Sequence, residues 1–147
     1  MTTAPEFALA SLSPKARGKI LAVALPVTFE EGQQIFREGD RAINLYVLTR
    51  GRIALEAHTP PHGTKIFATA EPGEWFSWSA LIGPRLETAT ARALEPSAAL
   101  AIKGGVLLDL CLEDPELGFE VYRMLADVIA ERLIASRLQM LDVFAAG

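Results

Sequence analysis

The residues best suited to hold a ligand lie together between residues 72 and 93. Pro72-Gly73 predicts a tight turn, because proline fixes φ and glycine tolerates a positive φ. Ser77 and Ser79 are both suited to cap the short apolar segment 80–82. A capped helix start leaves backbone N–H groups that point outward and favour an anion. The stretch therefore predicts a binding site for a small anion.

Motifs that would indicate an enzyme are few. The sequence contains no nucleophile elbow, no P-loop and no H-E-x-x-H pattern. The histidines, His58 and His62, flank two prolines, a spacing typical of an exposed hairpin rather than of a metal site. Cys111 lies in an apolar run and is predicted to be a buried small hydrophobe. We expect no catalytic residue, no metal ligand and no cofactor.

The composition indicates one acidic, apolar-rich domain. The chain has 147 residues, a formal charge of −4 and 50% hydrophobic residues. This length suits one domain with a substantial core, and the negative charge argues against a general nucleic-acid surface. No run approaches the roughly 18 apolar residues of a membrane span, and the N-terminus lacks a signal-peptide pattern. We expect a cytoplasmic protein.

Short strands separated by glycine and proline occupy the middle of the chain. The clearest one, residues 88–94, alternates polar residues with Ala89, Ala91 and Ala93, as in a half-buried strand. Glu56 is expected on the outer face of its own strand. Many short strands imply a sandwich or a barrel. The predicted strands cover residues 27–29, 34–37, 44–49, 52–59, 65–71, 88–94 and 97–102.

Helices are predicted at both ends of the strand region. Ser13-Pro14 begins one that reaches about Ala24, with serine as the cap and proline at the first helical position. The hydrophobic period changes at Gly104, after which residues 106–112 form a short helix. Asp114-Pro115 then begins a long one. Before the first helix, we expect a loose tail over residues 1–5 and a short helix or packing strip over residues 6–12.

The long C-terminal helix carries more than one apolar stripe. One stripe can dock on the strands, and the other is available for a partner helix. We therefore expect a homodimer through residues 115–144, with no direct DNA binding and no membrane contact. The alternative is that the C-terminal end folds back on its own domain. The apolar residues are Leu117, Phe119, Val121, Met124, Leu125, Val128, Ile129, Leu133, Ile134, Leu138, Leu141, Val143 and Phe144.

Two motifs together resemble the cyclic nucleotide-binding domain family, which includes the ligand domains of catabolite-activator-type regulators and of kinase regulatory subunits. Residues 31–51 match the family signature G-x-x-[IL]-[FI]-x-x-G-[DE] and the [LF]-Y-x-[IVL]-x-x-G that follows it. The resemblance implies an eight-stranded jelly roll with an N-terminal helix and a long C-terminal helix, used as a non-enzymatic regulatory module. The family's phosphate-binding cassette is matched at Pro72, Gly73, Glu74, Phe76, Ala80, Leu81, Ala89, Thr90 and Ala93.

This chain departs from the family pattern within the cassette. Ser77 replaces a glycine that lets the backbone approach the cyclic phosphate, and Trp78 replaces a glutamate that binds the ribose 2′-hydroxyl. Glu87 stands near the position of the phosphate-binding arginine, and Arg85 could replace that arginine only if the loop is repositioned. Removing one partner of an arginine–phosphate pair costs roughly 2–5 kcal/mol. The alternative is a cassette that binds no ligand. In that case we expect Trp78 to fill the pocket and Glu87 to pair with Arg85 or Arg92 on the surface.

The predicted ligand site is the cassette itself. We expect it to hold a small anionic ligand, with a cyclic nucleotide bound in an unusual mode as one candidate, and to signal through the C-terminal helix. Trp78 could stack on a ring of the ligand. The residues expected to line the site are Gly73, Glu74, Phe76, Ser77, Trp78, Ser79, Ala80, Arg85, Glu87, Thr88 and Ala89.

The whole chain is expected to form one domain, residues 1–147. Residues 1–25 form its N-terminal helical segment, residues 26–103 its β-roll and residues 104–147 its C-terminal helices. Besides the sensor, two other interpretations stay open. One is an interaction or dimerisation domain that keeps the fold without a ligand. The other is a metal-dependent, cupin-like enzyme, which rests on the fold and the two histidines.

Overall fold

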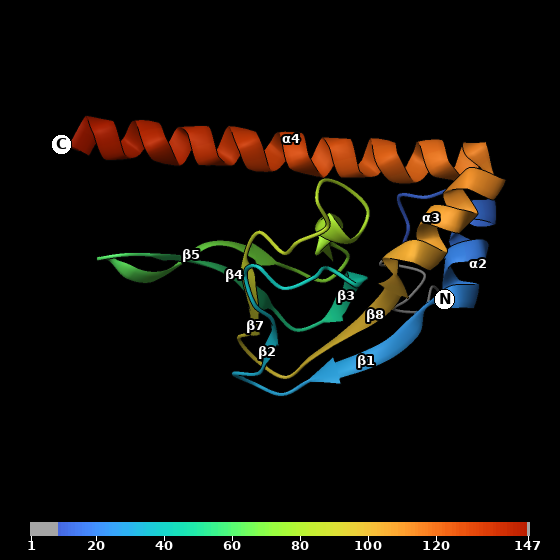
Figure 1. The fold of residues 1–147 in the computed structure, drawn as a ribbon, viewed down its shortest axis with the longest axis horizontal. Helices are drawn as coiled ribbons and strands as arrows, with labels where there is room; N and C mark the ends of the chain where they lie inside the picture. The colour runs from blue at the N-terminus through green and yellow to red at the C-terminus, as the bar shows by residue number, and fades with distance from the viewer. Residues whose placement is uncertain (1–8, 147) are drawn as a thin grey trace.

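Two four-stranded antiparallel sheets face each other in the part of the chain that the computed structural model describes, residues 9–146. Their strand orders are β1-β8-β3-β6 and β2-β7-β4-β5, which confirms the predicted jelly roll (Figure 1). The strands are β1 Leu25–Phe29, β2 Gln34–Phe36, β3 Asn44–Arg50, β4 Ile53–Thr59, β5 Gly63–Ala70, β6 Trp75–Phe76, β7 Thr90–Ala93 and β8 Ser97–Lys103.

The helices begin where the capping residues predicted them. The Ser13 hydroxyl accepts a hydrogen bond from the Ala16 N–H at 3.3 Å, and Asp114 Oδ1 accepts one from the Leu117 N–H at 3.3 Å. Both caps satisfy a donor that the first helical turn leaves free. The helices are α2 Pro14–Val23, the 3-10 helix η1 Trp78–Ala80, α3 Gly104–Glu113 and α4 Pro115–Ala146.

The N-terminal segment before α2 packs as a strip. Leu9 and Leu12 are buried, and the backbone over residues 9–12 forms a turn. The tail expected over residues 1–5 lies outside the described residues, as do residues 6–8 of the expected short helix.

Strand β3 supplies both hydrophobic clusters of the core. Leu45 and Val47 face the cluster that includes residues of α2, α3 and α4, whereas Leu48 faces the cluster between the sheets. In the second cluster the Tyr46 and Phe76 rings are stacked with centroids 5.0 Å apart. Each buried large apolar side chain contributes roughly 1.5–3 kcal/mol. The core therefore holds both the helices and the cassette strand β6 against β3.

Glu56 lies on the predicted face of β4. It pairs with Thr90 of β7, whereas its neighbour Leu55 pairs with Ala91, and Leu55 and Ala91 face the core between the sheets. Glu56 is nonetheless buried, and it accepts a hydrogen bond from Arg92 Nε at 3.2 Å. The sequence of β4 alone does not reveal this burial, because it depends on a side chain of the neighbouring strand β7.

Helix α4 docks on the roll only through its first half. Leu117, Val121 and Leu125 are buried, while the Glu120 carboxylate accepts hydrogen bonds from Ser13 N and Oγ, both at 2.8 Å. The helix then continues past β5 (Figure 1), and residues 133–142 are exposed. The C-terminal end therefore does not fold back on its own domain. No helix in the described region is long and apolar enough to cross a membrane.

Candidate functional site

The backbone of the cassette turns sharply after β6. Ser77 adopts a left-handed conformation with φ 64° and ψ 41°, and η1 follows directly. The prediction that Ser77 and Ser79 cap this helix is wrong. The Ser77 side chain makes no capping hydrogen bond, and Ser79 lies within η1 rather than before it. A left-handed residue other than glycine is uncommon, so the conformation of Ser77 requires support from its surroundings.

Backbone hydrogen bonds turn the Glu87 side chain inward. The Glu87 N–H donates to the Asp40 carbonyl and the Gly39 N–H donates to the Glu87 carbonyl, both at 2.8 Å. Glu87 as a whole is only 5% exposed. The surface pair with Arg85 or Arg92, which the ligand-free alternative predicted, is therefore wrong, since Glu87 is buried and Arg92 binds Glu56 instead. The alternation of the buried residues Ala89, Ala91 and Ala93 already indicated that the Glu87 side chain points inward. Glu87 lies two residues before Ala89 and so falls on the same face.

The hydroxyl of Ser77 supports the buried carboxylate. Ser77 Oγ lies 2.9 Å from Glu87 Oε1 and 2.8 Å from Oε2, so it donates to both oxygens. Burial of the carboxylate raises the pKa of Glu87 from 4.5 to about 7. The Ser77 hydrogen bond opposes that rise, and the charge of Asp40 adds to it. Near neutral pH, Glu87 is thus divided between its acid and carboxylate forms.

A cavity of about 60 Å³ lies at this carboxylate. It brings together six residues that the sequence predicted for the ligand site, Ser77, Trp78, Ser79, Glu87, Thr88 and Ala89. Its remaining walls are Phe36, Leu55 and Phe67, which the sequence analysis did not assign to the site. These come from β2, β4 and β5, and nothing in their local pattern signals that they approach the cassette.

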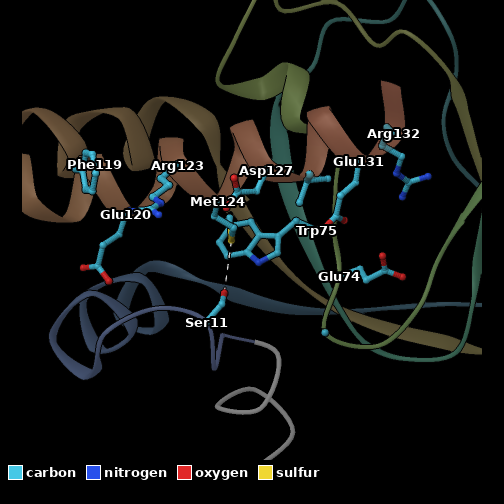
Figure 2. Close-up of a pocket in the computed structure, with 12 residues that line it drawn as sticks. Ser11, Glu74, Trp75, Phe119, Glu120, Arg123, Met124, Asp127, Glu131 and Arg132 are labelled. Atoms are coloured by element: carbon cyan, nitrogen blue, oxygen red, sulfur yellow. Dashed lines mark hydrogen bonds between the residues drawn. The ribbon is translucent and has the colours of Figure 1, made fainter. Parts of the chain in front are cut away.

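The other predicted residues lie elsewhere. Phe76 and Ala80 are buried in the hydrophobic core. Gly73 and Glu74 line a separate groove of about 510 Å³ beneath the first half of α4. Figure 2 shows this groove with Trp75 at its centre, α4 residues along one side and Ser11 on the other. The structure therefore divides the predicted site between a small cavity, the core and a groove.

Arg85 does not move into the cassette. Its backbone is left-handed with φ 59°, and its carbonyl accepts a hydrogen bond from the Ala42 N–H at 2.8 Å. The exposed side chain lines an open surface depression together with Arg41 and Lys103. The loop repositioning that would let Arg85 replace the family's phosphate-binding arginine is absent from this arrangement.

Trp78 joins the cassette to α4. The guanidinium carbon of Arg132 lies 5.8 Å from the centre of the Trp78 ring, within cation–π range. Trp78 and Phe67 also line a groove of about 340 Å³ between β5 and α4. The small cavity and this groove therefore share two aromatic walls.

Residues considered for other chemistry lie away from the cassette. His58 and His62 are exposed at the hairpin between β4 and β5. Within residues 9–146, no group of three or more His, Cys, Asp and Glu side chains is placed to hold a metal ion. Cys111 is buried, as predicted, and burial raises the pKa of its thiol. A buried thiol with a raised pKa is a poor nucleophile.

Comparison with known proteins decides the family. The sequence profile of the cyclic nucleotide-binding domain matches residues 26–114. The chain belongs to the cyclic nucleotide-binding domain family. The match includes α3 and all of the roll except Leu25, so it covers both the cassette and the strands that surround it.

Relatives of this cyclic nucleotide-binding domain include longer regulatory proteins. It is 22% identical over 115 residues to the CRP-like cAMP-activated global transcriptional regulator of Mycobacterium tuberculosis, covering 78% of this chain and 51% of that protein. It is 32% identical over 78 residues to the cAMP-dependent protein kinase regulatory subunit of Dictyostelium discoideum, covering 50% of this chain and 24% of that protein. It thus spans about half of the first relative and less of the second.

A solved structure supports the fold independently. The crystal structure of a cyclic nucleotide-binding domain from Methylobacillus flagellatus KT superposes with a TM-score of 0.86 at 18% identity. The superposition covers 94% of this chain and 83% of the other.

Proposed function

We propose that this domain is a non-enzymatic, cytoplasmic regulatory module that forms a homodimer through α4 and couples the state of its cassette to that helix. The observation that carries the proposal is the direct contact between Trp78 of the cassette and Arg132 of α4. Because Trp78 lines the cavity, a ligand that moves this ring also changes the contact with α4.

Two further contacts tie η1 to the helices. The Tyr122 hydroxyl on α4 donates to the Leu81 carbonyl at 3.3 Å. Gly104 at the start of α3 packs so closely on Ala80 that an added Cβ would lie 2.2 Å from the Ala80 oxygen. Close-packed contacts of this kind transmit small displacements rather than absorbing them. A shift of η1 is therefore expected to alter the packing of both α3 and α4.

The proposed dimer surface is the apolar face of α4 that points away from the roll. Phe119, Leu133 and Met140 are exposed large hydrophobic residues separated by multiples of seven positions. Ala126 completes this series, and Ile129 lies at the intermediate heptad position. A seam with apolar residues in a heptad repeat is typical of a two-helix coiled coil. A second copy of α4 would cover this seam.

The cassette cavity favours a small ligand over a cyclic nucleotide. Its volume of about 60 Å³ is far below the pockets of roughly 300 Å³ and more that hold drug-sized ligands. The Glu87 carboxylate also repels a phosphate. The small size equally favours the second candidate, an interaction domain that works without a ligand. The metal-dependent enzyme has no support among the described residues.

Sedimentation equilibrium at neutral pH tests the proposed dimer. We expect a dimer for the parent chain and a monomer for Leu133→Glu combined with Met140→Glu, because two buried charges in the seam are costly. Gln139→Glu is the matched control, since it adds a charge on the same exposed turns without altering an apolar seam residue. A parent chain that stays monomeric at about 100 μM contradicts the proposal.

A further inference from the structure

We propose that the cassette cavity binds a small organic cation, an alkylammonium group, through the Glu87 carboxylate and the aromatic side chains that surround it. This inference rests on the proposed regulatory function, because it names the ligand class for the same cassette. It reverses the charge of the ligand that the family cassette is built to hold, in line with the replacement of arginine by Glu87.

The buried carboxylate lacks a positively charged partner within the described residues. The ion pairs there join Lys19 to Asp114, Arg52 to Glu71 and Arg92 to Glu56, and none reaches Glu87. A carboxylate has about four acceptor positions, whereas the Ser77 hydroxyl supplies a single hydrogen. A buried charge is costly until it is paired and hydrogen-bonded. An ammonium group, with up to three donors, would supply both the charge and the hydrogen bonds.

The remaining walls suit the carbon atoms and the charge of such a ligand. Phe36, Phe67 and Trp78 line the cavity together with Leu55 and Ala89. Aromatic rings attract cations through their negative faces, and cages of aromatic rings are a known way to hold ammonium groups. The Arg132 guanidinium already lies over the Trp78 ring, so one side of this indole holds a cation in the folded protein.

The size of the cavity sets the size of the ligand. One water needs roughly 10–15 Å³ of such space, so about 60 Å³ admits an ammonium nitrogen with a few carbons. A longer chain could continue into the groove between β5 and α4, which shares the Phe67 and Trp78 walls. Phe67 and Thr88 are exposed at the rim, which gives the ligand a way in.

Isothermal calorimetry with n-propylammonium chloride at pH 8, where Glu87 is ionised, tests this inference. Sodium chloride at equal concentration controls for the effect of ionic strength. n-Propanol controls for the charge of the ligand, because it has a similar size and shape but is neutral. We expect saturable binding to the parent chain and at least about tenfold weaker binding to Glu87→Gln.

Phe67→Ala, at a partly exposed position, should weaken binding about two- to fivefold through loss of a cation–π wall. Glu95→Gln, at an exposed carboxylate, should bind like the parent.

Circular dichroism confirms that each variant is folded before titration. Absence of saturable heat with the parent chain, equal affinity for Glu87→Gln, or equal affinity of n-propanol would each overturn the inference. Saturable binding of cyclic AMP without binding of propylammonium would overturn it while leaving the proposed regulatory function intact. A monomeric parent chain in sedimentation would instead overturn the proposed dimeric module, whatever the calorimetry shows.

Discussion

Ser77 donates its hydroxyl to both oxygens of the Glu87 carboxylate, at 2.9 and 2.8 Å. In the comparison with the family's sequence pattern, Ser77 stands at a glycine position and Glu87 stands near the position of the phosphate-binding arginine. The contact joins the two side chains directly, so we expect their effects on stability to be coupled. Without Ser77 the buried carboxylate would lose this donor, which costs free energy because a buried acceptor is left without a partner.

Glu87→Gln should remove a pH-dependent loss of stability. The pKa of Glu87 is about 7 in the folded chain and about 4.5 in the unfolded chain. Below about pH 4.5 the side chain is protonated in both the folded and the unfolded chain, so its titration does not lower the stability. Between 4.5 and 7 the unfolded chain loses its proton while the folded chain keeps it, so stability falls as pH rises. Above 7 the cost is complete, on the order of 3 kcal/mol.

Urea unfolding at pH 4.5 and pH 8 measures this effect. We expect Glu87→Gln to match the parent near pH 4.5 and to exceed it by about 1–3 kcal/mol at pH 8, because glutamine keeps an acceptor for Ser77 without a charge. Glu95→Gln, at an exposed position, serves as the control. An equal effect of Glu87→Gln at both pH values would show that the carboxylate is ionised throughout this range.

Ser77→Ala should be strongly destabilising only when Glu87 is present. Loss of a hydrogen bond to a charged group costs about 1.5–3 kcal/mol, and loss of one to a neutral group about 0.5–1.5. A double-mutant cycle with Glu87→Gln at pH 8 isolates the difference as a coupling energy. Ser77→Gly should lose less than Ser77→Ala, since glycine relieves the left-handed conformation. A coupling energy near zero would mean that the two side chains act independently.

Gly104→Ala should destabilise the junction between the cassette and the helices. An added Cβ would lie 2.2 Å from the Ala80 carbonyl oxygen, which is backbone and cannot rotate away. We expect a loss of about 1–3 kcal/mol or more in thermal or urea unfolding. Gly105→Ala is a well-matched control, because nothing lies within 4 Å of its added Cβ. Similar stabilities of the two variants would show that η1 moves freely relative to α3.

Restoring the family residues should create cyclic nucleotide binding. The variant Ser77→Gly, Trp78→Glu and Glu87→Arg supplies the glycine, the ribose acceptor and the phosphate partner together, and removes the large indole from the cavity wall. We expect cyclic AMP to bind at least about a hundredfold more tightly than to the parent chain, since the absence of one partner of an arginine–phosphate pair costs roughly 2–5 kcal/mol. Calorimetry measures the change, and the variant that keeps Glu87 is the control. No gain would show that the cassette backbone differs from that of binding-competent relatives.

Local chemistry explains why much of the fold was predictable. The caps at Ser13 and Asp114 depend on donors within three residues of each cap, so short sequence windows contain the whole interaction. The alternation of Ala89, Ala91 and Ala93 likewise follows from the two-residue period of a strand. Extended by two residues, the same alternation also indicates that Glu87 points inward.

The walls and the charge balance of the site depended on contacts between distant segments. Arg132 meets Trp78 from α4, and Phe67 reaches the cavity from β5, although neither position shows any local sign of it. Arg85 faces away because its carbonyl bonds Ala42 across the loop. The sequence alone therefore determined the element types, the jelly roll and the family. Only tertiary packing decided which residues share a cavity, because it fixes side-chain direction through backbone partners that lie tens of residues away.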